Sequence, residues 1–157
     1  MRTIIAVLFL VITLTPLSAQ RAEGIRWTEF ADLADSLRRE PRPLLVFIEA
    51  DWCRYCRLQR ATTFQDTTVV DLLNGRFYSL RLDAECREPI VFMGRTYSYV
   101  ARGPNAGRHE LAELLGRIAG NWSLPVTILL DKNRRIIQKW PGYIFTDLLI
   151  SALYETI

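Results

Sequence analysis

The 157-residue sequence has few of the residues from which disulfide scaffolds and metal sites are built: three cysteines and one histidine. Three cysteines are too few for a disulfide-stapled scaffold, and one histidine is too few for a site with several histidine ligands. An excess of one charge is also missing, because 20 basic and 17 acidic residues leave a formal charge of +3 without any run that would mark a nucleic-acid-binding face. Half of the residues are hydrophobic, as is typical of one globular domain, so function must be read from local motifs.

The amino terminus has the pattern of a secretory signal peptide over residues 1–19. A basic start and the uncharged apolar run Ile4–Leu14 precede a proline and small residues, and we expect cleavage after Ala19. The run is shorter than the roughly 20 apolar residues that span a bilayer, although an uncleaved anchor is the alternative. We therefore expect residues 20–157 to form a secreted or periplasmic domain, without stable membrane insertion, where thiols meet oxidants.

The rest of the chain alternates helical and strand patterns. Apolar residues recur at helical spacing in three segments, and two more helices are expected from Cys53 and from Thr68 to a stop at Gly75. The three segments are 28–39, 109–118 and 145–152. The predicted strands are 44–48, 77–82, 126–130 and 135–140, the last two forming a hairpin.

The order of these elements predicts the fold class. The βαβ unit at 44–82 implies parallel, right-handed pairing of its two strands. Residues 85–108 have no regular pattern. We expect an α/β sandwich around a mixed central sheet of about four strands with flanking helices.

Two of the cysteines form a Cys-x-x-Cys pair, Cys53 and Cys56, which follows a buried strand and opens a helix. A thiol at a helix amino terminus meets unpaired backbone N–H groups and the positive end of the helix dipole, which favour the thiolate. Lowering a thiol pKa from about 8.5 to about 7 corresponds to roughly 2 kcal/mol of differential stabilisation. The pattern predicts Cys53 as the attacking thiol and Cys56, one turn further on, as the more buried resolving thiol.

Two other interpretations of the pair stay open. A Cys-x-x-Cys motif can be half of a zinc site, which Cys86 and His109 would have to complete. The second interpretation is a purely structural disulfide, although a disulfide that closes such a small loop adds little to stability. Outside the pair, Cys86 is interpreted as a bystander, with a third redox thiol as the alternative. His109 is interpreted as a surface histidine at a helix start. No metal or cofactor is expected.

Several segments resemble the thioredoxin superfamily, and the resemblance covers about residues 27–157. The sequence is most similar to the secreted, disulfide-reductase-like branch, which includes the carboxy-terminal periplasmic domain of the transmembrane thiol:disulfide reductase. The segments that carry the resemblance are Glu49–Cys56, Thr63–Asp66, Val69–Val70, Leu82–Ala84, Leu124–Thr127, Leu130–Asn133 and Pro141–Tyr143.

The resemblance implies a thioredoxin-like three-layer sandwich and assigns roles to single residues. Cys53 is the implied nucleophile and Cys56 the resolving thiol. Pro125 corresponds to the family's cis-proline, whose loop faces the sulfurs, and the backbone of Leu124 pairs with a substrate strand. Trp52 shields the dithiol. Implied partners are disulfide-bonded or thiol-bearing proteins, with a membrane-borne reductase as the electron donor.

The sequence departs from the family pattern beside the pair. The family usually has a buried acid six residues before the first cysteine, and Phe47 stands there. Glu49, four residues before Cys53, is the candidate for proton transfer, with a solvent-facing carboxylate as the alternative. Arg54–Tyr55 replaces the usual Gly-Pro between the cysteines. An insert at about 88–121 is longer than a minimal thioredoxin needs; a partner-docking surface and a loop without function are the two alternatives for it.

The predicted function is that of an extracytoplasmic thiol-disulfide oxidoreductase that reduces or exchanges protein disulfides. A disulfide oxidant or isomerase on the same fold is one alternative. A binding module without catalysis, which holds a partner in the cleft near Pro125, is another.

Overall fold

The computed structural model describes residues 24–104 and 106–157, so the predicted signal peptide lies outside the described residues. Along the chain it contains five α-helices, one 3₁₀ turn and eight strands within these ranges. The helices are α1 (Phe30–Arg39), α2 (Arg54–Ala61), α3 (Thr67–Arg76), α4 (Glu110–Gly116) and α5 (Thr146–Thr156), with the 3₁₀ turn η1 at Thr63–Gln65. The strands are β1 (Leu44–Glu49), β2 (Tyr78–Asp83), β3 (Ile90–Phe92), β4 (Arg95–Tyr97), β5 (Tyr99–Gly103), β6 (Ala106–His109), β7 (Val126–Leu130) and β8 (Ile136–Pro141).

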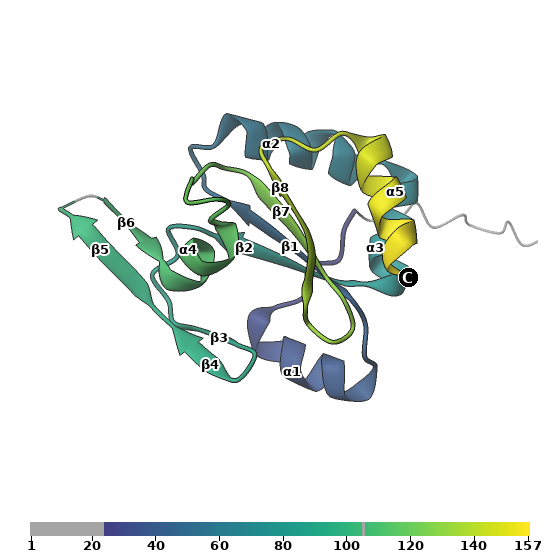
Figure 1. Ribbon diagram of the computed structural model, residues 1–157, viewed down its shortest axis with the longest axis horizontal. Coiled ribbons are helices and arrows are strands. Elements are labelled where there is room, and N and C mark those ends of the chain that lie inside the picture. Colours follow the sequence, from purple (N-terminus) through teal and green to yellow (C-terminus); the bar gives the residue numbers. More distant parts are fainter. Residues whose placement is uncertain (1–23, 105) are drawn as a thin grey trace, which may run out of the picture.

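A four-stranded mixed sheet in the order β2-β1-β7-β8 forms the centre of the molecule (Figure 1). Strand β1 pairs in parallel with β2 and antiparallel with β7, which pairs antiparallel with β8. This is the mixed sheet that the sequence predicts. Every residue of β1 is buried, as its continuous apolar run indicates.

Helices cover both faces of the sheet, and the alternation of β1 assigns a core to each face. Leu44, Val46 and Ile48 pack into a cluster with side chains of α1 and α4. Leu45 and Phe47 pack into a second cluster with both paired cysteines and side chains of α3 and α5. The result is the predicted three-layer sandwich, with α2, α3 and α5 on one face and α1 and α4 on the other (Figure 1).

Helix α3 starts and ends differently from the prediction. Asp66 is its N-cap, because its carboxylate accepts the backbone N–H groups of Thr68 and Val69. Thr68, the predicted start of this helix, therefore lies inside the first turn. Gly75 does not stop the helix, which continues to Arg76. No helix in the described ranges is long and apolar enough to cross a membrane.

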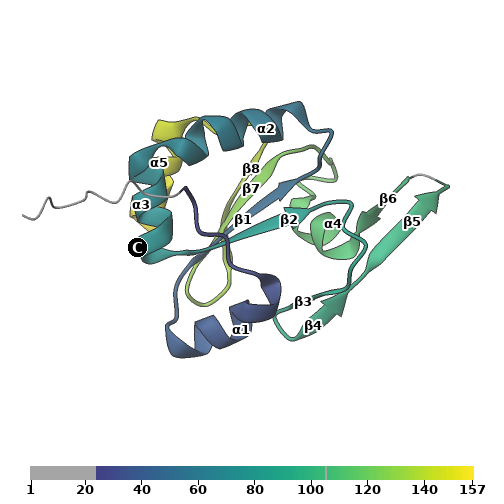
Figure 2. The ribbon, with the colours of Figure 1, turned by 180° about the vertical axis from the view of Figure 1, so that it is seen from behind.

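The segment predicted to be irregular contains two antiparallel hairpins, β3–β4 and β5–β6. We call residues 89–104 and 106–109 the arm. Its first hairpin lies against α1, where the rings of Phe30 and Phe92 meet edge to face at 6.0 Å. Its second hairpin projects from the body of the molecule in both views (Figures 1 and 2). These strands of three to five residues carry mostly exposed side chains, so they lack the apolar alternation by which a strand is recognised.

Candidate functional site

The Cys-x-x-Cys pair lies at the amino terminus of α2, directly after the turn that follows β1. Cys53 is the N-cap residue, and its Sγ accepts the backbone N–H of Cys56 at 3.1 Å. A disulfide joins Cys53 to Cys56, and the two residues are 4% and 0% exposed. The sulfur of Cys53 thus occupies the position where a negative charge is stabilised by a backbone donor and by the helix dipole.

The loop before β7 reaches the same end of the sheet as the dithiol. The Leu124–Pro125 peptide bond is cis, and Pro125 is buried. Its carbonyl accepts the N–H of Gly142 at 2.7 Å, where a φ of 79° suits a glycine. Because Ile48 pairs with Val126, the proline lies level with the last residues of β1, next to the turn that leads to Cys53. Among the described residues, no backbone hydrogen bond engages Leu124.

Trp52 lies on the opposite side of the dithiol, toward β2. Its indole N–H donates to the Glu85 carboxylate at 2.9 Å, and the side chain is largely exposed. Tyr55, between the two cysteines, is exposed as well. Large aromatic side chains therefore flank the cysteine pair at the surface, where a bound polypeptide could contact them.

A buried network of uncharged groups ties α2 to the proline strand, and sequence reasoning missed it. The Gln59 amide donates to Thr127 Oγ1 at 3.0 Å and accepts the backbone N–H of Ile144 at 3.1 Å. Thr63 Oγ1 donates to the Ile144 carbonyl at 2.8 Å. Gln59, Thr63 and Thr127 are fully buried. The signal available in the sequence is the position of Gln59, one helical turn after Cys56 and hence on the same buried face.

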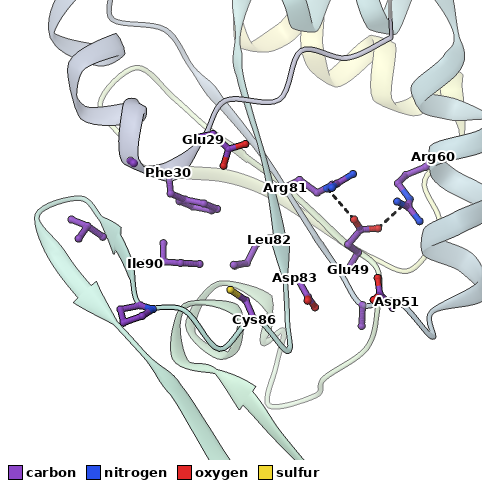
Figure 3. Close-up of a pocket in the computed structure, with 14 residues that line it drawn as sticks. Glu29, Phe30, Glu49, Asp51, Arg60, Arg81, Leu82, Asp83, Cys86 and Ile90 are labelled. Carbon is purple, nitrogen blue, oxygen red and sulfur yellow. Dashed lines mark ion pairs between the residues drawn. The ribbon is translucent and has the colours of Figure 1, made fainter.

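Glu49 occupies the other flank of α2, toward β2 (Figure 3). Its carboxylate pairs with Arg60 Nε at 3.2 Å and with Arg81 Nε at 3.3 Å. The residue is only 7% exposed, so the solvent-facing alternative for Glu49 is wrong. Burial raises the pKa of the Glu49 carboxyl, and the guanidinium groups of Arg60 and Arg81 act against that rise.

A cavity of about 470 Å³ lies beside this carboxylate and also contains the third cysteine. Glu49, Asp51, Asp83 and Cys86 are among the residues that line it (Figure 3). Cys86 is half-buried, and its thiol makes a long 3.8 Å contact with the Glu88 carbonyl. Since Cys86 lies in the turn after β2 and not at a helix amino terminus, it lacks the backbone donor that Cys53 has.

The expectation of a surface position for His109 is wrong. The residue is fully buried and is the N-cap of α4, where its Nδ1 accepts the N–H of Leu111 at 3.2 Å. Burial lowers the pKa of the imidazole. Within residues 24–104 and 106–157, no three His, Cys, Asp or Glu side chains form a group suited to a metal ion.

Comparisons with known proteins agree with this geometry. A search of curated protein sequences found no match. Among solved structures, the DsbH oxidoreductase has a TM-score of 0.58 at 12% identity, with 94% of each chain covered. A putative disulphide-isomerase from Bacteroides thetaiotaomicron has a TM-score of 0.55 at 20% identity, covering 85% of this chain and 93% of that one. The reduced DsbD carboxy-terminal domain from Neisseria meningitidis has a TM-score of 0.50 at 19% identity, covering 84% and 100%.

At these identities the structural likeness concerns the fold, and the family follows from the sequence itself. The family model described as a thioredoxin-like domain matches residues 31–156. That range contains the cysteine pair, the proline loop and all four strands of the central sheet. The chain belongs to the thioredoxin-like domain family.

Proposed function

We propose that the protein is an extracytoplasmic thiol-disulfide oxidoreductase that reduces or exchanges disulfides in other proteins. The observation that carries the proposal is the N-cap position of Cys53, whose sulfur accepts the Cys56 backbone N–H. This contact and the helix dipole favour the thiolate of the reduced protein, and the thiolate is the attacking species in disulfide exchange.

In the proposed reaction the Cys53 thiolate attacks one sulfur of a substrate disulfide. The substrate S–S bond breaks, one substrate thiolate leaves, and a mixed disulfide joins Cys53 to the substrate. The Cys56 thiol loses its proton and attacks the Cys53 sulfur, which releases the second substrate thiolate. Two electrons pass to the substrate, and the protein is left with the Cys53–Cys56 disulfide. A membrane-borne dithiol reductase is the proposed donor that returns these two electrons.

The proposed substrate contacts lie around the cysteine pair. Leu124 offers a free backbone N–H and carbonyl next to the cis peptide bond, so an extended substrate segment can pair with it. Pro125 keeps this loop close to the dithiol. Trp52 covers the opposite side of the dithiol, where its hydrogen bond with Glu85 holds it.

Glu49 is the proposed proton acceptor for Cys56. It follows Phe47 on the same face of β1, and Phe47 packs in one cluster with Cys56. Its raised pKa suits a group that takes up and returns a proton. No hydrogen bond joins Glu49 directly to Cys56 among the described residues, and Cys56 does not line the cavity beside Glu49. The proposed transfer therefore needs a water molecule between the two side chains.

Insulin reduction with dithiothreitol as the electron source tests the proposed activity. The wild type should accelerate precipitation of the insulin B chain, and Cys53→Ser should fall to the background rate. Cys86→Ser serves as the matched cysteine control and should keep full activity. Equal rates for the wild type and Cys53→Ser would overturn the proposal.

The proposed location has a separate test. Expression of the full chain in a bacterial host should yield exported protein whose amino-terminal sequence begins at Gln20, the residue after the predicted cut. Retention of Met1 on protein that stays in the cell would contradict export.

A further inference from the structure

The arm carries a charge imbalance that the rest of the chain lacks. Residues 89–109 contain three of the 20 basic residues, Arg95, Arg102 and Arg108, and none of the 17 acidic residues. The remaining 17 basic and 17 acidic residues balance each other, so the whole formal charge of +3 resides on this segment. A surface with one sign of charge attracts partners of the opposite sign before contact.

The arm extends from the end of the molecule that holds the dithiol. Because β1 and β2 are parallel, their carboxyl ends meet at one edge; β1 leads there to Cys53, and β2 leads into the arm. The hydrogen bond from Trp52 to Glu85 joins the segment that follows β1 to the segment that follows β2. In both views the arm projects from this end, with β5–β6 outermost (Figures 1 and 2). A protein bound at the dithiol therefore lies within reach of the arm.

The base of the arm is anchored in the core, whereas the outer backbone edges of its β5–β6 hairpin are not paired with any other described strand. Phe92 and Tyr97 are buried against the core, and the N–H of His109 donates to the Ala84 carbonyl at 2.8 Å. Among the described strands, β5 and β6 pair only with each other. The outer edge of each strand thus presents backbone groups that an extended chain can bind.

A groove between the outer hairpin and α4 combines charged side chains of both signs with apolar surface. Its volume is about 280 Å³, and Val100 and Leu114 are exposed beside it. Three arginines share the carboxylate of Glu113: Arg102 at 3.7 Å, and Arg108 and Arg117 in closer contact. The second acid of the groove, Glu110, accepts the backbone N–H of Ser98. The three arginines and the two carboxylates leave one positive charge in excess around the groove, which an incoming acid can meet.

We propose that the arm is a docking surface for a segment of the substrate protein that combines acidic and apolar side chains. The acids meet Arg95, Arg102 and the surplus charge around Glu113, and an apolar side chain covers Val100 and Leu114. The proposal rests on the proposed function, because it assigns this segment to the protein whose disulfide Cys53 attacks. It adds what the dithiol alone does not specify, the charge of the preferred substrate.

The test compares two peptides that contain the same disulfide, one flanked by Glu and Leu and the other by Lys and Leu. The wild type should reduce the acidic peptide about tenfold faster in kcat/KM at low salt, in the lower part of the range that charge steering gives. This preference should shrink as added salt screens the charges. The double variant R95Q/R102Q should lose the preference and reduce a small uncharged disulfide at the wild-type rate.

The double variant R39Q/R76Q is the matched control. It removes the same charge from exposed residues that precede β1 and β2, at the opposite end of the sheet from the dithiol, and it should keep the preference. Equal reduction of both peptides by the wild type, or equal losses in both double variants, would overturn the docking proposal alone. Failure of the wild type to reduce any of the three disulfides would overturn the proposed function together with it.

Direct binding gives a readout that does not depend on turnover. The acidic peptide with both cysteines replaced by serine should bind the oxidised wild type more tightly than R95Q/R102Q in a fluorescence titration. Equal affinity for the two proteins would contradict docking at the arm.

Discussion

Helix α2 has two flanks that differ in chemistry: the β7 flank, which is neutral, and the β2 flank, which is charged. Toward β7, the uncharged Gln59 bonds to Thr127 and to the Ile144 backbone, with every partner buried. Toward β2, Glu49 is held by two arginines at the wall of a cavity of about 470 Å³. The first flank is buried and uncharged, and the second is charged and borders a cavity.

The difference assigns separate tasks to the two flanks. Buried hydrogen bonds between uncharged groups are costly to break, because each partner is left without water or protein to replace the bond. The β7 flank therefore fixes the distance between the dithiol helix and the proline loop. Partly exposed ion pairs contribute little to stability, but their carboxylate titrates. The β2 flank therefore controls how the site responds to pH.

Gln59→Leu breaks the neutral flank and should have the largest effect on stability. It leaves Thr127 Oγ1 and the Ile144 N–H buried without their partner, at an expected cost of about 2–4 kcal/mol in the free energy of unfolding. Urea denaturation measures this loss. The matched control is Gln65→Leu, because Gln65 is exposed and its change should cost under about 0.5 kcal/mol. Equal losses in the two variants would remove the distinction between the flanks.

Glu49→Gln tests the charged flank through its pH dependence. Because the pKa of Glu49 is raised in the folded protein, the folded state holds this proton more tightly than the unfolded state, whose glutamate titrates near a pKa of about 4.3. The resulting stabilisation is present below that unfolded pKa and is lost as the pH rises through the folded pKa.

The unfolding free energy of the wild type, measured relative to Glu49→Gln, should therefore increase as the pH is lowered from neutral toward 4. Urea titrations of both proteins across this range give the difference at each pH, which cancels the other titrating groups. A difference that falls with decreasing pH would mean that Arg60 and Arg81 outweigh burial.

Cys86→Ser should have the smallest effect, although Cys86 lines the same cavity as Glu49. The thiol makes only a long contact with the Glu88 carbonyl, so stability should change by less than about 0.5 kcal/mol. Insulin reduction should stay within about twofold of the wild type, the scatter expected of a surface change. A loss of turnover comparable to that of Cys53→Ser would make Cys86 a third redox thiol.

The sequence predicts the parts of the site that short patterns encode. The apolar run of β1 and the pair at the start of α2 are adjacent in the chain, and the predicted family and mixed sheet are confirmed. The contact of Gln59 with Thr127 spans 68 residues, so it depends on packing that no local pattern contains. The polar character of His109 predicts a surface position, but capping α4 requires only its Nδ1, and the fold buries the whole imidazole ring.

The central claim, that Cys53 attacks and Cys56 resolves, is tested most directly by trapping the mixed disulfide. Reduced Cys56→Ser is mixed with a disulfide-containing protein, and the products are analysed by non-reducing electrophoresis and peptide mass spectrometry. The account predicts a covalent complex linked through Cys53 that dithiothreitol releases, and no complex with Cys53→Ser. A covalent complex of Cys53→Ser linked through Cys56 or Cys86 would contradict the account. A complex of Cys56→Ser linked through Cys86 would contradict it as well.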